Sequence, residues 1–171
     1  MAAIARLHAS ADHALMMATT LVIDTNVCLD LFVFEDPRCL WLMQALEEGS
    51  IRALASDPMR VEWQQVLARP KLGLSASRQN RAQARYDRLI GWHSHCGKSP
   101  GVRLPRCADA DDQMFLELAA DVGASALLSR DRALLVLSRR SQRMAGFMVM
   151  TPEQFEPHWR ALTACRLPVS G

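Results

Sequence analysis

The chain has 171 residues, half of them hydrophobic, and a formal net charge of +2, a composition typical of a globular domain with a sizeable core. No apolar run approaches the roughly 20 residues of a membrane span, and the first twenty residues lack the apolar region of a secretory signal. We therefore expect a cytoplasmic protein with no membrane partner, whose five cysteines, odd in number and without a C-x-x-C pair, are free thiols.

Strands and helices alternate along the chain. In chain order we expect a strand at residues 21–23 that ends at Asp24, a helix at 37–48 and a second strand at 51–55. Two helices, at 57–68 and 75–92, come next, followed by a short edge strand near 102–104. There follow a helix at 109–122, a strand at 124–128, a helix after Ser129, a strand at 146–150 and a short helix opened by a Thr151–Gln154 capping box.

The alternation predicts a three-layer α/β/α fold with a mostly parallel central sheet. We expect one main domain over residues 20–156, because no internal repeat or linker interrupts it. It is preceded by an N-terminal extension at 1–19 and followed by a C-terminal tail at 157–171.

Four carboxylates follow the predicted strands or lie early in the next helices: Asp24, Glu62, Asp112 and Asp131. The carboxyl ends of parallel strands share one edge of a sheet, where ligands bind in open α/β folds. Two carboxylates about 4 Å apart repel by roughly 4 kcal/mol at an effective dielectric constant near 20. A hard divalent cation, Mg²⁺ or Mn²⁺, would relieve such repulsion.

Each acid except Asp24 also has a purely structural interpretation. Glu62 could lie on a solvated helix face, Asp109 and Asp112 could cap a helix, and Asp131 could complement a helix dipole.

The same acids lie in four motifs that resemble those of the PIN-domain family. The motifs are Asp24-Thr25-Asn26, the stretch from Val61 to Leu67, the stretch from Cys107 to Ala119 and the stretch from Leu128 to Leu135. The resemblance covers about residues 20–156, and its ending at 150–155 is similar to the branch of VapC-like toxins of toxin–antitoxin systems. Beside the third acid, Ala110, Gln113 and Met114 replace the usual proline, acid and lysine, which leaves Asp112 in place but weakens the case for Asp109 and Asp111 as helpers.

The resemblance implies a PIN-like fold and metal-dependent cleavage of RNA. Asp24, Glu62, Asp112 and Asp131 would hold one or two Mg²⁺ or Mn²⁺ ions that activate a water molecule for attack on phosphorus. Asn26, Ser129 and Asp109 would orient these acids, whereas Thr25 would support the turn. The implied partners are RNA, a protein antitoxin and a second copy of the chain.

Four arginines recur at steps of three and four in the predicted helix at 75–92, which places them on one face: Arg78, Arg81, Arg85 and Arg88. We expect this arginine stripe to contact the RNA backbone or an acidic partner segment. A solvated helix face is the alternative.

Other functions stay open. The chain could be a PIN-fold nuclease that processes RNA or acts on DNA without an antitoxin, or a non-catalytic PIN-like binding module. A zinc site from His93, His95, Cys96 and Cys107 fits no standard ligand spacing. A dehalogenase-type phosphatase would need a second aspartate where Asn26 stands.

Overall fold

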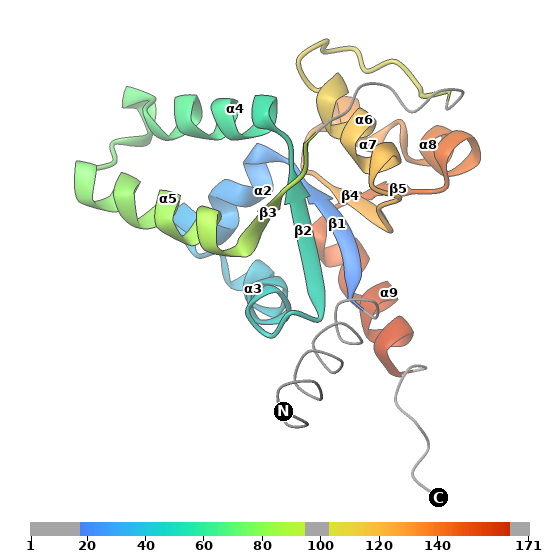
Figure 1. Cartoon of the computed structure of the whole chain (residues 1–171), viewed down its shortest axis with the longest axis horizontal. Coiled ribbons are helices and arrows are strands. Elements are labelled where there is room, and N and C mark those ends of the chain that lie inside the picture. Colours follow the sequence, from blue (N-terminus) through green and yellow to red (C-terminus); the bar gives the residue numbers. More distant parts are fainter. Residues whose placement is uncertain (1–17, 95–102, 165–171) are drawn as a thin grey trace, which may run out of the picture.

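A computed structural model describes residues 18–94 and 103–164 of the chain. Five parallel strands form one sheet in the order β3-β2-β1-β4-β5 (Figure 1). The strands are β1 (Thr19–Ile23), β2 (Ile51–Ala55), β3 (Ile90–Trp92), β4 (Ala126–Leu128) and β5 (Met148–Met150). The expected α/β/α fold with a parallel central sheet is confirmed.

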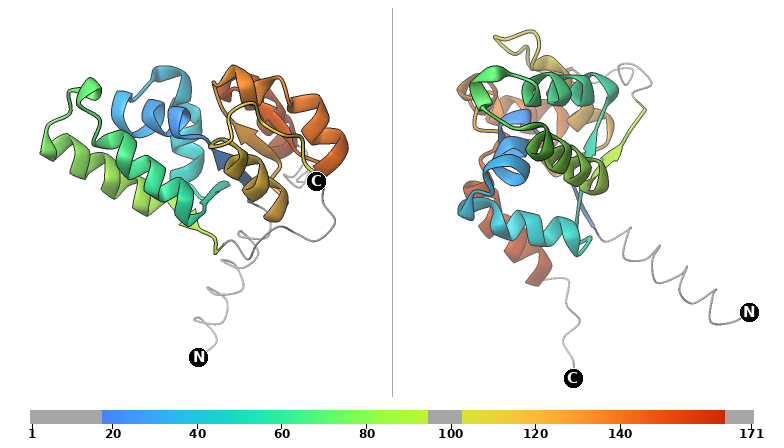
Figure 2. Two further views of the ribbon diagram at one scale, coloured as in Figure 1. Left: turned by 90° about the horizontal axis from the view of Figure 1, so that it is seen from above. Right: turned by 90° about the vertical axis from the view of Figure 1, so that its left-hand side faces the viewer.

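Helices cover both faces of the sheet (Figures 1 and 2). Crossovers between parallel strands are right-handed as a rule. The connections from β1 to β2 and on to β3 therefore carry their helices on one face of the sheet, and the return to β4 and β5 carries the later helices on the other. The first group is α2 (Thr25–Leu29), α3 (Leu40–Glu47), α4 (Asp57–Leu67) and α5 (Ala76–Leu89). The second is α6 (Gln113–Asp121), α7 (Arg132–Leu135) and α8 (Ser138–Ala145), while the last helix, α9 (Pro152–Ala164), packs against α3.

The core is continuous from the sheet into the first helical layer. Leu21 and Val22 of β1 are fully buried, as expected for a central parallel strand. Three aromatic rings then join a π-helical turn at Asp30–Phe34 (η1) to α4 and α5. Trp63 stacks on Tyr86 with centroids 5.0 Å apart, and Phe32 meets both rings edge-on. This packing fixes the helix that carries Glu62.

The edge strand differs from the prediction. It is formed by Ile90–Trp92, not by residues 102–104: Arg103 and Leu104 are irregular, and residue 102 lies outside the described part. The predicted helix at 75–92 instead ends at Leu89, because Ile90 turns extended (φ −101°, ψ 113°) and pairs with Ala53 of β2. Pairing with a neighbouring strand outweighed the local helical pattern.

Several boundaries also shift. The apolar run after Asp24 forms α2 and η1, and a 3₁₀ turn at Pro37–Cys39 precedes α3. α6 begins at Gln113 rather than at 109, and the helix predicted after Ser129 is divided into α7 and α8.

At the chain ends, the capping box is confirmed by reciprocal hydrogen bonds between Thr151 and Gln154. Its helix, α9, runs on to Ala164, past the expected start of the tail at 157. Of the predicted N-terminal extension, Thr19 already belongs to β1 and Ala18 directly precedes it, whereas residues 1–17 lie outside the described part. In the described ranges no helix is both long and apolar enough to span a membrane.

Candidate active site

The predicted acids lie around the point where the strand order reverses. β1 and β4 are neighbours, with Ile23 level with Leu128, although their connections run to opposite sides of the sheet. The Asp24 amide donates to the Leu128 carbonyl across this junction at 2.9 Å. Crevices at such switch points, outside the carboxyl ends of the strands, are where open α/β sheets bind ligands.

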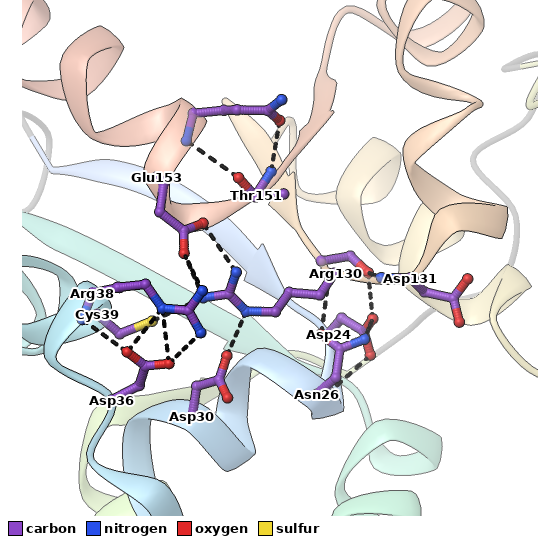
Figure 3. A network of polar contacts seen from close by, with 12 residues as sticks. Asp24, Asn26, Asp30, Asp36, Arg38, Cys39, Arg130, Asp131, Thr151 and Glu153 are labelled. Carbon is purple, nitrogen blue, oxygen red and sulfur yellow. Dashed lines mark hydrogen bonds and ion pairs between the residues drawn. The ribbon is translucent and has the colours of Figure 1, made fainter.

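Asp24 is the fixed centre of this region (Figure 3). It is 4 % exposed, and its Oδ2 accepts hydrogen bonds from Asn26 Nδ2 at 2.6 Å and Ser129 Oγ at 2.5 Å. The same two residues also hold the loop after β4. Asn26 Oδ1 accepts from the Arg130 amide at 3.1 Å, and Ser129 Oγ accepts from the Asp131 amide at 2.9 Å. Two loops 105 residues apart are thereby locked around one carboxylate.

Burial raises the pKa of Asp24 to about 6, although the hydrogen bonds from Ser129 and Asn26 oppose the rise. The charge of Glu62 adds to it. A buried carboxylate whose charge is opposed by a second carboxylate is poorly stabilised in the absence of a cation.

Glu62 is half-buried on α4 and faces the same region, so it does not lie on a solvated helix face. Burial raises its pKa, a hydrogen bond from Thr25 lowers it, and the charge of Asp112 raises it again. The contact changes our view of Thr25. Expected only to support the turn, this buried side chain also holds the Glu62 carboxylate.

Asp112 stands at the N-cap position of α6 but makes no capping hydrogen bond, and the Asp109 side chain accepts instead from the Asp111 amide at 3.0 Å. The interpretation of Asp109 and Asp112 as helix caps is therefore wrong. Burial raises the pKa of Asp112 to about 6, and the further contributions come from other carboxylates, first Asp24 and Asp131, then Asp109 and Asp111.

Gln113, which replaces an acid usual in the family motif, braces the loop that presents Asp112. Its Oε1 accepts from the Cys107 amide at 2.9 Å, and its Nε2 donates to the Pro105 carbonyl at 3.4 Å. The glutamine at this position therefore stabilises the loop through two hydrogen bonds to its backbone.

Asp131 lies at the start of a helix, as its structural interpretation required. It is exposed, and its Oδ1 caps α7 by accepting from the Ala133 amide at 2.6 Å. Its charge nevertheless reaches Asp112.

These acids influence one another through their charges without forming a closed ligand set. Within residues 18–94 and 103–164, no three His, Cys, Asp or Glu side chains are grouped closely enough to hold a metal ion. The donors are all carboxylate oxygens, which suits a hard divalent cation, but the side chains would have to close around it. Of the zinc alternative, His93 contacts Asp121 instead, and residues 95 and 96 lie outside the described part.

The arginine stripe lies on α5, where each of its members has an intramolecular contact. Arg81 and Arg85 share Glu35 Oε1 at 3.0 and 2.6 Å, Arg88 pairs with Glu47 at 3.0 Å, and Arg78 donates to the Val33 carbonyl at 3.4 Å. The stripe therefore ties α5 to η1 and α3. Arg81 is still 71 % exposed, and contact with RNA or a partner stays a prediction.

Arg130 was not predicted as a functional residue. In the sequence, only its position between Ser129 and Asp131 connects it to the site. Its guanidinium pairs with Asp30 of η1 at 2.6 Å and with Glu153 of α9 at 2.8 Å (Figure 3). One side chain thus connects the loop after β4 to two helical segments of the opposite layer.

The raised pKa values of Asp24 and Asp112 predict how the metal-free protein responds to pH. Both groups bind protons more tightly when folded, so their contribution to the free energy of unfolding is present at acid pH and lost as pH rises through 6. For Asp24 the whole loss is about 3 kcal/mol, roughly half of it between about pH 5 and 7.5.

We therefore expect the melting temperature in chelator to fall over that interval. In the control variant Asp112→Asn the fall should be smaller, because one of the two titrating groups is gone. A melting temperature that stays level or rises in wild type would contradict the burial of these charges.

The comparison with known families agrees with this geometry. The profile of the PIN domain matches residues 20–133, about two thirds of the chain, from β1 through the turn that carries Asp131. The matched span includes all four predicted acids. No curated protein is significantly similar in sequence to the chain. The chain therefore belongs to the PIN-domain family, whose fold is generally that of nucleases.

Proposed function

We propose that this protein is a Mg²⁺- or Mn²⁺-dependent endoribonuclease and the toxin of a toxin–antitoxin pair. Membership of the PIN family supports a nuclease. The motif resemblance, including the ending at residues 150–155, supports the choice of RNA and of a toxin.

The observation that carries the proposal is the environment of Asp112. Its pKa is raised to about 6 by burial and by four carboxylates, and no lysine or arginine is among the main influences on it. A helix cap or a structural ion pair would lower the pKa of an aspartate. Acids held together against their mutual repulsion are instead typical of a site for a divalent cation.

Asp24, Glu62, Asp112 and Asp131 would hold the ion. When bound, the ion supplies an activated water molecule and neutralises charge on the phosphate. Asn26 and Ser129 fix the plane of the Asp24 carboxylate through their short bonds to Oδ2. Oδ1 accepts only a longer bond, 3.4 Å, from the Asn26 amide, and its remaining lone pair would serve a ligand. Thr25 holds Glu62 toward the same point, with Asp109 beside Asp112 as an accessory charge.

The proposal extends to partners. A protein antitoxin would silence the enzyme, and the family resemblance favours a homodimer. The arginine stripe would contact RNA or an acidic segment of the antitoxin. The alternatives are a PIN nuclease of RNA processing or of DNA, and a non-catalytic module in which the acids serve only structure.

A cleavage assay tests the function. The purified protein is incubated with single-stranded RNA and with DNA of the same sequence, in Mg²⁺, Mn²⁺ or chelator. We expect RNA cleavage with either metal, no cleavage in chelator and intact DNA. Cleavage that persists in chelator would refute metal dependence, and equal cleavage of DNA would refute the choice of RNA. For the toxin, expression alone should arrest growth, and co-expression of a small adjacent gene should relieve the arrest.

A further inference from the structure

Trp92 lies in the same row of the sheet as the residue before Asp24. It ends β3 level with Ala55, and the register of β2 with β1 places Ala55 level with Ile23. Neighbouring strands are about 4.8 Å apart, so the Cα atoms of Trp92 and Ile23 are separated by about 10 Å. The indole therefore belongs to the edge of the sheet that carries the predicted acids.

The Trp92 side chain is exposed, and one hydrogen bond orients its indole ring. It is 55 % exposed, and its Nε1 donates to Asp57 Oδ1 at 2.8 Å, at the start of the helix that bears Glu62. The strand beneath it is also held in place. The His93 amide donates to the Ala55 carbonyl at 2.9 Å. At Gly91 the backbone comes so close to β2 that an added Cβ would lie 2.9 Å from Leu54 Cδ2.

The other tryptophans behave differently. Trp63 and Trp41 are 1 % and 7 % exposed, and Trp159 is half-buried against Trp41. Among the four, Trp92 alone keeps most of its surface in solvent, even though a large aromatic side chain gains much from burial. Its polar edge is satisfied by Asp57, so what it offers to a ligand is its apolar face.

We propose that Trp92 is a stacking platform for an unpaired base of the RNA strand whose phosphate is cleaved at the neighbouring acids. The proposal rests on the proposed function and adds a subsite to it. Exposed aromatic side chains stack on the splayed-out bases of single-stranded RNA. Since every base has a π-face, the subsite recognises single strands without strong sequence preference, and base-paired RNA binds it poorly.

The test is a binding measurement in chelator, with the full chain and a single-stranded RNA of about ten nucleotides. Trp92→Leu should weaken binding by about 5- to 150-fold, since stacking on one base contributes about 1–3 kcal/mol. Trp92→Phe, which retains an aromatic face, should bind within a few-fold of wild type. Leu162→Ala is the control, because Leu162 is also an exposed apolar side chain (44 %) but lies near the end of α9, and it should bind as wild type does.

Tryptophan fluorescence provides a second readout. RNA should quench the emission of wild type, and most of this quenching should disappear in Trp92→Phe although that variant still binds. Melting curves show whether each variant is folded.

Two results would overturn the inference alone: wild-type RNA affinity in folded Trp92→Leu, or an equal loss in Leu162→Ala. In the first case, loss of a protein partner by the same variant would identify the surface as a protein-docking site. These results differ from failure of the proposed function, in which wild type with metal cleaves no RNA.

Discussion

Asp112→Asn is expected to abolish cleavage while leaving the metal-free protein as stable as wild type or slightly more stable. Asn has nearly the same shape, no capping hydrogen bond is lost, and one charge is removed from among mutually repelling carboxylates. The variant should also lose the stabilisation that wild type gains from Mn²⁺, about 1.4 kcal/mol at ten times Kd. Melting curves with and without Mn²⁺, together with the RNA cleavage assay, measure all three effects.

Asp111→Asn is the matched control, because Asp111 is an exposed neighbour whose charge also acts on Asp112. It should retain both cleavage and the response to Mn²⁺. If Asp112→Asn and wild type are stabilised equally by Mn²⁺, Asp112 is not part of the site. A destabilised Asp112→Asn variant in chelator would show that its carboxylate supports the fold.

Arg130→Met should have the largest effect on stability, lowering the free energy of unfolding by about 2–3 kcal/mol. Removing one partner of a buried ion pair leaves an uncompensated charge, which typically costs about 3–5 kcal/mol, and the effect is reduced here because Arg130 is 25 % exposed. Asp30 would lose its cation, and Glu153 would lose the nearer of its two arginine partners. Arg130→Lys should recover only part of the loss, since a single ammonium cannot reproduce the planar guanidinium fork. Urea unfolding measures the difference.

Arg38 provides the comparison for Arg130. It also pairs with Glu153, at 3.6 Å, but its side chain is 61 % exposed, so Arg38→Met should shift the unfolding curve little. If the two variants were equally stable, Arg130 would be a surface residue in energetic terms, and the connection between the loop after β4 and α9 would be unimportant.

The parts of the fold that were predictable are those encoded locally. The apolar run before Asp24, the second strand before α4 and the Thr151 capping box are short-range signals, and each was located correctly within a few residues. The alternation of strands and helices then determines a parallel sheet, whose carboxyl edge holds the acids.

The parts that were not predictable depend on contacts between distant segments. Ile90 continues a helical pattern and becomes a strand only because β2 is beside it. The arginine stripe is regular in sequence, but its pairing with Glu35 depends on a left-handed backbone at that residue, with φ 51°, at the end of a π-helical turn. Arg130 likewise acquires its partners only from the packing of η1 and α9.

The connection from Arg130 to Glu153 has a consequence for the order of events during synthesis. Asp24 leaves the ribosome first, but Ser129, which bonds its carboxylate, follows 105 residues later, and Glu153 later still. The N-terminal part of a chain is made first, so the contacts around Asp24 are complete only when α9 has emerged. Under the proposed nuclease function, a nascent chain would therefore carry an incomplete site until its last helix is made.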